Sequence, residues 1–258
     1  MKIRPLPPIA RFIEPNWPAP ANIRALSTTR PGGCSAAPFD SFNLAHHVGD
    51  EPTAVAANRG VLGDNLPAGT AIQWLTQVHG IQVVAAGDYA DYPEADAAWS
   101  KDPIKACAVL TADCLPVLFC TVSGDRVAAA HAGWRGLVDG VLEATVAALD
   151  TDPLQLMAWL GPAIGPQAFE VGAEVRDRFL AAAPACDRAL AAACFQPSDA
   201  KTGHYFANLY TLARLRLGSL GINAVFGGGL CTYTDSTRFY SYRRDGQTGR
   251  MATLILLQ

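Results

Sequence analysis

Short apolar runs bounded by turn-forming residues recur along the chain, and this pattern predicts β-strands. The runs occupy residues 23–29, 71–80, 81–86, 106–111, 115–120, 125–131, 154–162, 222–228 and 251–257. The triplet Ser-Gly-Asp at 123–125 predicts a hairpin turn between two of these runs.

Helical spacing of apolar residues predicts three helices. After Gly136 the apolar positions that recur at this spacing are Leu137, Val141, Leu142, Val146 and Leu149. A second helix is predicted from about 173 to 183, and a third over 206–221. The third carries apolar residues at Leu209, Leu212, Leu215 and Leu220 and stops at Gly221. Residues 183–194 fit either a helix or a loop.

These strands occur both as hairpins and in alternation with helices, which favours a mixed α/β (α+β) fold with layered mixed sheets and flanking helices. A pure dinucleotide-binding layout is disfavoured, because the chain has no GxGxxG motif. We predict a single domain over residues 1–258, in which the proline-rich residues 1–20 form an extended lead-in.

Composition narrows the class of protein. Half of the residues are hydrophobic, only 17% are charged and the formal net charge is -3, so the chain is globular and carries no basic surface for nucleic acid or an anionic membrane. No apolar run approaches the roughly 20 residues of a membrane span, and the N-terminus has no apolar signal region. Seven cysteines, an odd number without a CxxC pair, match no disulfide framework. We therefore expect a cytoplasmic protein, a monomer or weak homo-oligomer, without nucleic-acid or membrane partners.

Three reactive side chains stand at the ends of predicted strands: His79, Cys114 and His131. Strand ends of one sheet can converge at one edge, and such edges commonly carry functional sites. One thiolate and two imidazoles form a three-ligand set that leaves a fourth position open, which is the arrangement of catalytic zinc and also suits copper. The spacings of 35 and 17 residues match no short metal motif.

The same atoms also allow chemistry without a metal. Cys114 could act as a nucleophile with His131 as its base, and Asp113 or a carbonyl could orient the ring. Asp113 is also a candidate for proton transfer, although adjacent side chains point to opposite faces of a strand unless the chain turns between them.

Two glycine-containing segments add candidates for anion binding. Gly133 and Gly136 permit a tight turn before a helix, where backbone N–H groups and Arg135 could attract an anion. Residues 238–250 place several arginines, Arg243 among them, between aromatic residues, where they could hold phosphate or stack on a base.

A series of motifs in one order resembles a known family. The motifs are SFNLAHHVGD, NR at 58–59, TQVHG, ADAAWS, TADCLPVLF, AAAHAGWRGL, LGPAIGPQAFEVG, CTYTD and FYSYRRDGQTGR. From about residue 22 to the C-terminus they are similar to the YfiH family, also described as laccase-domain or multicopper polyphenol oxidoreductase proteins and as peptidoglycan editing factors. This chain departs from the family's motifs at Ala45, Ser100, Phe169 and Asn208. None of these is among His79, Cys114 and His131.

The resemblance implies layered sheets flanked by helices, with a core similar to that of toxin-type cysteine deamidases. It implies that His79, Cys114 and His131 bind one zinc ion. It further implies a purine nucleoside phosphorylase acting on adenosine, inosine, guanosine and methylthioadenosine, with adenosine deaminase activity. Asn43 and Arg59 are carried over as substrate contacts on motif position.

The residues favour this function over multicopper oxidation, because five histidines are too few for several copper ions. We predict a zinc-dependent enzyme, with copper possible, whose catalytic residues are His79, Cys114, His131 and Asp113. Arg135 and Arg243 are predicted to join Asn43 and Arg59 in binding purine nucleosides and inorganic phosphate. The alternatives are a Cys–His amide hydrolase that edits peptidoglycan precursors, a copper-dependent polyphenol oxidase, and a metal-dependent binding protein without turnover.

Overall fold

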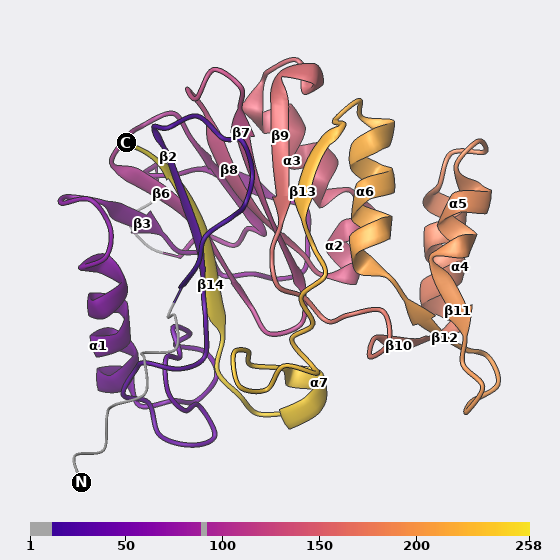
Figure 1. Cartoon of the computed structure of the whole chain (residues 1–258), viewed down its shortest axis with the longest axis horizontal. Coiled ribbons are helices and arrows are strands. Elements are labelled where there is room, and N and C mark those ends of the chain that lie inside the picture. The colour runs from indigo at the N-terminus through magenta and orange to yellow at the C-terminus, as the bar shows by residue number, and fades with distance from the viewer. Residues whose placement is uncertain (1–11, 89–91) are drawn as a thin grey trace, which may run out of the picture.

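The strands pair into three sheets within residues 12–88 and 92–258, the part of the chain that the computed structural model describes (Figure 1). A five-stranded sheet has the order β1 (Phe12–Ile13), β2 (Ile23–Thr28), β14 (Met251–Leu257), β6 (Lys105–Thr111) and β3 (Ala71–Gln73). A six-stranded sheet has the order β13 (Ala224–Gly227), β9 (Leu156–Leu160), β7 (Leu115–Thr121), β8 (Val127–Ala132), β5 (Ala97–Ser100) and β4 (Val83–Ala85). A small sheet joins β10 (Glu170–Gly172), β12 (His204–Ala207) and β11 (Phe195–Pro197).

The two large sheets pack face to face. Successive side chains of a strand point to opposite faces, so each strand contributes alternate residues to the core between the sheets. In β6, Cys107 and Val109 join the core between the sheets, together with Leu118 from β7 and Ile255 from β14. The alternate residues of β6 and β14 pack instead against α1 (Pro52–Gly63) on the outer face of the five-stranded sheet. Every residue from Met251 to Leu257 is buried, as expected of a strand covered on both sides.

Helices cover the outer face of the six-stranded sheet. They are α2 (Trp134–Asp139), α3 (Val141–Leu149) and α6 (Leu209–Ser219), with α4 (Ala173–Ala182) and α5 (Arg188–Ala193) beside the small sheet (Figure 1). A short helix, α7 (Tyr242–Asp245), precedes β14. Both large sheets contain parallel and antiparallel pairs, so the predicted mixed α/β architecture is confirmed.

Several element boundaries differ from the prediction. The run 71–80 is a strand only to Gln73, because the next residues leave the sheet as a loop. The helix predicted after Gly136 begins at Trp134 and breaks at Gly140, whose φ of 108° is left-handed. The third predicted helix starts at Leu209, and the residues before it form β12. Of the predicted lead-in, residues 1–11 lie outside the described residues, and Phe12–Ile13 pair with β2.

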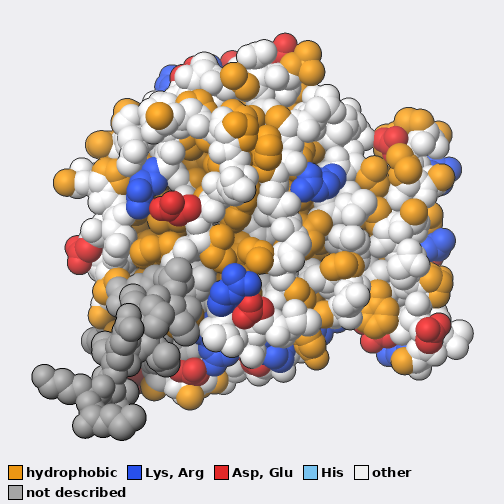
Figure 2. Space-filling model, in the orientation of Figure 1, with side chains coloured by type: hydrophobic (Ala, Val, Ile, Leu, Met, Phe, Trp, Pro, Cys, Tyr) orange, Lys and Arg blue, Asp and Glu red, His pale blue; other side chains and the backbone are white. Residues whose placement is uncertain are grey.

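The surface carries mixed charge. On the face shown in Figure 2, basic and acidic side chains are scattered singly or in small mixed groups among apolar and uncharged ones. No helix in the described ranges is long and apolar enough to span a bilayer.

We predict that Phe119→Ala lowers the free energy of unfolding by about 3–5 kcal/mol, because Phe119 is fully buried between the six-stranded sheet and its helices. Leu154→Ala is the control, since Leu154 is 67% exposed, and it should change that free energy by less than about 0.5 kcal/mol. Urea unfolding followed by circular dichroism measures both variants. Equal effects of the two substitutions would contradict the packing described here.

Candidate metal centre

The turn between β6 and β7 carries Asp113 and Cys114 across from one large sheet to the other. Asp113 has a φ of 102°, a conformation that non-glycine residues rarely adopt and that clusters at functional sites. The chain therefore turns between the two side chains, which removes the geometric objection raised by a continuous strand.

Internal hydrogen bonds engage both carboxylate oxygens of Asp113, which is 8% exposed. Thr232 Oγ1 donates to Oδ1 at 2.6 Å, and the backbone N–H of Arg243 donates to Oδ2 at 2.7 Å. Asp113 thus ties the turn before β7 to the segment that contains α7.

Asp96 organises the loop that carries His79. This fully buried carboxylate accepts backbone N–H bonds from Val78 at 3.2 Å, His79 at 2.9 Å and Gly80 at 2.7 Å. The sequence predicted that His79 ends a strand, and this prediction is wrong. His79 lies in this loop with a left-handed φ of 63°.

His131 lies in β8 and is 3% exposed. Its Nδ1 is 2.8 Å from Asp96 Oδ1. Because Asp96 accepts the proton of Nδ1, Nε2 is the nitrogen left to face the other two side chains, and a metal ion can replace its proton. Asp96 therefore supports both histidines, although the sequence analysis did not single it out. The signal available was a carboxylate directly before the apolar residues of ADAAWS.

The three predicted ligands come together. Their donor atoms all lie within 4.8 Å of one another, and Cys114 Sγ is 3.8 Å from His79 Nε2. In a tetrahedral site with bonds of about 2.0–2.3 Å, the ligand atoms lie roughly 3.3–3.6 Å from one another. Side-chain rotations that move the donor atoms by about one ångström would therefore close this set around one ion. Within residues 12–88 and 92–258 this is the one group of three or more His, Cys, Asp or Glu side chains close enough to share an ion.

The electrostatics of the group favour a thiolate. Burial raises the pKa of the Cys114 thiol, but the charge and hydrogen bond of His131, with His79, outweigh burial and lower it to about 6. Burial lowers the pKa of His131, whereas Cys114 and Asp96 raise it to about 9. Burial likewise raises the pKa of Asp96, but the hydrogen bonds from His131, Gly80 and Val78 bring it below the ordinary value.

Glycines in HAGWRG allow this close approach. A Cβ at Gly133 would stand 2.8 Å from His79 Cδ2 and 3.0 Å from Cys114 Sγ, and one at Gly136 would stand 2.8 Å from Gly80 O. The helix that follows Gly133 has six residues and starts at Trp134, and the anion expected at its start stays a prediction.

A cavity of about 410 Å³ opens beside the metal-ligand set. Arg135 and Arg243, both predicted to bind substrate, line it. The other lining side chains that matter here are the aromatic residues Trp134, Phe169 and Tyr242, and the basic residues His47 and Arg250.

Asn43 and Arg59 lie behind the cavity wall. Asn43 is fully buried and its Oδ1 accepts the backbone N–H of Arg250 at 2.9 Å. The Arg59 guanidinium carbon is 4.0 Å from the ring centroid of Trp74, and its Nε donates to Leu44 O. Both residues therefore hold the loop that carries His47 instead of lining the cavity.

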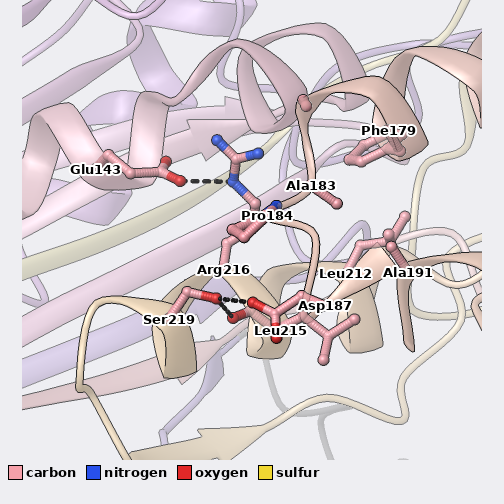
Figure 3. A pocket seen from close by; sticks show the side chains of 11 residues that line it. Glu143, Phe179, Ala183, Pro184, Asp187, Ala191, Leu212, Leu215, Arg216 and Ser219 are labelled. Atoms are coloured by element: carbon pink, nitrogen blue, oxygen red, sulfur yellow. Dashed lines mark hydrogen bonds and ion pairs between the residues drawn. The ribbon is translucent and has the colours of Figure 1, made fainter. Parts of the chain in front are cut away.

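A smaller cavity of about 150 Å³ lies between α3, α4, α5 and α6 (Figure 3). The ion pair between Glu143 and Arg216 lies on one side of it, and Ser219 donates to Asp187 on another. Its remaining walls are apolar side chains, and it contains none of the predicted site residues.

We predict that Asp96→Asn weakens Zn²⁺ binding about 10- to 100-fold, because the two histidines lose the carboxylate that orients them. Competition with a chromophoric chelator measures the affinity. The control is Asp177→Asn on the exposed side of α4, which should leave the affinity unchanged. Wild-type affinity in Asp96→Asn would contradict the orienting role.

Comparison with known proteins identifies the family. Residues 24–258 match the model described as multi-copper polyphenol oxidoreductase laccase. The chain is 56% identical to a purine nucleoside phosphorylase of Pseudomonas aeruginosa over 96% of this chain and 98% of that protein. It is 50% identical to the purine nucleoside phosphorylase YfiH of Escherichia coli, over 96% of this chain and 100% of that protein.

A solved structure has the same fold. The crystal structure of a Neisseria meningitidis protein matches with a TM-score of 0.90 at 47% identity, over 96% of this chain and 99% of that one. The resemblance to YfiH proteins is thereby confirmed, and the chain belongs to the multi-copper polyphenol oxidoreductase laccase family.

Proposed function

We propose that the protein is a zinc-dependent purine nucleoside phosphorylase that accepts adenosine, inosine, guanosine and methylthioadenosine, with adenosine deaminase as a side activity. The observation that carries this proposal is the His79–Cys114–His131 set beside a cavity that offers both flat aromatic surfaces and guanidinium groups. The names of the relatives from Pseudomonas aeruginosa and Escherichia coli support the same reaction.

In phosphorolysis a phosphate oxygen forms a bond to the sugar C1′ as the bond from C1′ to the purine N9 breaks. The bonding electrons leave with the purine, which gains the proton of hydrogenphosphate, so the products are a free purine and ribose 1-phosphate. The protein must therefore hold an anion, expose one face of the sugar and bind a flat heterocycle.

The cavity walls offer a surface for the heterocycle and charge for the anion. The aromatic rings of Trp134, Phe169 and Tyr242 offer apolar surface to a purine, and stacking on such rings is favourable. Arg135 and Arg243 contribute positive charge. Together they suit a ligand with an apolar base and a polar sugar better than a purely apolar one.

A bound zinc ion would be held by His79, Cys114 and His131 and would supply a Lewis acid with one open position. His131 keeps its Nε2 available because Asp96 holds Nδ1. We assign Asp113 a positioning role, since both its oxygens already accept hydrogen bonds.

The deaminase side activity requires water to replace the amino group at the purine C6, with release of ammonia. The same three side chains can serve it, because a metal site with an open position can also bind water. Adenosine would then yield inosine as a second product.

A Cys–His hydrolase is the second candidate, and one observation favours it. The thiol pKa of about 6 at Cys114, beside a His131 oriented by Asp96, is also the arrangement of a nucleophile, its base and an orienting carboxylate. Such an enzyme could edit peptidoglycan precursors by cleaving an amide bond. Copper-dependent phenol oxidation has no comparable support. A multicopper enzyme needs several metal sites, whereas the described residues contain one group of three or more side chains that could hold an ion.

All seven cysteines are unpaired, which suits a reducing compartment, and we therefore propose a cytoplasmic enzyme of small-molecule substrates. The expectation of a monomer or weak homo-oligomer stays a prediction.

We predict that adenosine and inorganic phosphate give adenine and ribose 1-phosphate, and that chelation or Cys114→Ala lowers this rate at least about 100-fold. Added Zn²⁺ should restore the chelated wild type but not the variant. Chromatography of the bases and an assay for ribose 1-phosphate measure the reaction. Cys186→Ser, at an exposed cysteine, is the matched control and should keep the full rate.

Two results would decide against phosphorolysis. One is undiminished turnover of metal-free protein. The other is covalent labelling of Cys114 by iodoacetamide in the metal-loaded enzyme, together with amide hydrolysis that chelators leave unchanged. The latter would establish the hydrolase instead.

A further inference from the structure

Arg250 differs from the other two arginines of the cavity in burial. Arg135 is exposed and its guanidinium carbon lies 4.6 Å from the ring centroid of Trp134. Arg243 is also exposed, and its Nη1 donates to Glu170 O at 2.8 Å. Arg250 is only partly exposed, so its charge lies deeper than either of the others.

The backbone of Arg250 is fixed on both sides. Its N–H donates to the side chain of Asn43 at 2.9 Å, and its carbonyl accepts from Leu44 N at 3.3 Å. Its Nη1 donates to the carbonyls of Thr248 at 2.9 Å and Gly249 at 3.1 Å. The side chain is therefore held in place before any ligand arrives, which lowers the entropy cost of binding.

The Arg250 guanidinium also contacts an aromatic ring, with its carbon 5.8 Å from the ring centroid of Tyr242. Its Nε and Nη2 donate to no residue in the described ranges, and no carboxylate there lies within ion-pair distance of it. Asp113, the one carboxylate lining the cavity, has both oxygens engaged by Thr232 and the Arg243 backbone. Neither Nε nor Nη2 of Arg250 is a buried unpaired atom, so both are open to solvent and free to donate to an anion that enters the cavity.

Arg250 lines the same cavity as His79, Cys114 and His131, so an anion bound to its guanidinium would lie beside the metal ligands. His47 also lines the cavity, and burial and the neighbouring Arg250 lower the pKa of its imidazole. A neutral ring there can accept the hydrogen bond of a hydrogenphosphate O–H.

We propose that Arg250 and His47 form an oxyanion subsite that holds the inorganic phosphate of the reaction, with Asn43 as the positioning residue of Arg250. This inference rests on the proposed phosphorolysis for its ligand, whereas the anion site itself follows from the contacts of Arg250. The fork of a guanidinium matches two oxygens of a tetrahedral anion.

The test compares four variants of the zinc-loaded enzyme: Arg250→Gln, Arg250→Lys, Arg135→Gln and Arg176→Gln. Arg250→Gln should raise the KM for phosphate about 10- to 100-fold while the KM for adenosine changes less than about twofold. Arg250→Lys keeps the charge without the fork and should fall between the wild type and Arg250→Gln. Arg176→Gln removes a positive charge on α4, outside the cavity lining, and should match the wild type.

A binding readout separates this subsite from the proposed reaction. Inorganic phosphate, compared with chloride at equal ionic strength, should raise the Tm of the wild type and of Arg176→Gln but not that of Arg250→Gln. If the wild type shows this shift without any phosphorolysis, the proposed function fails and the oxyanion subsite stands. Circular dichroism and zinc content confirm that each variant is folded, and Arg250→Lys provides the comparison if Arg250→Gln does not fold.

Two outcomes overturn the inference. The first is an unchanged phosphate KM and Tm shift in both Arg250 variants. The second is a rise in the phosphate KM in Arg135→Gln instead.

Discussion

The buried carboxylate of Asp96 is the constraint on which the candidate metal centre depends. It collects three successive backbone N–H groups from the loop of His79 and the Nδ1 of His131 on the neighbouring strand. A carboxylate buried this completely is stable only when donors surround it. The same bonds that satisfy Asp96 therefore bring two imidazoles, far apart in the sequence, to one thiol.

The two packed sheets supply the rest of the geometry. The chain crosses from one sheet to the other at Asp113 and Cys114, and the left-handed φ of Asp113 lets the thiol face the histidines while the carboxylate faces Thr232. Gly133 leaves room where a Cβ would collide with His79. The site thus lies where two layers meet, and the arginine-bearing segment before β14 closes it from the side.

The sequence predicted most of the layered fold, because the runs that form β6, β7, β8 and β14 are continuous and strongly apolar. It also predicted that His79, Cys114 and His131 come together, since each is a reactive side chain next to an apolar run. It failed for the loop of His79, where the apolar pattern continues beyond Gln73 although the chain leaves the sheet to bond Asp96. Long-range hydrogen bonds of this kind leave no periodic signal, so the sequence does not reveal that Asp96 bonds both histidine-bearing segments or that Asn43 and Arg59 bond the segments beside the cavity. The position of Arg250 depends in the same way on a contact with Asn43 across 207 residues.

The candidate metal centre depends on one ion held by His79, Cys114 and His131, and X-ray absorption at the zinc K-edge of active enzyme tests this most directly. We predict one ion per chain with one sulfur at about 2.3 Å and two or more nitrogen or oxygen atoms at about 2.0–2.1 Å, the sulfur disappearing in Cys114→Ala. A zinc environment without sulfur in enzyme that still cleaves nucleosides would contradict it.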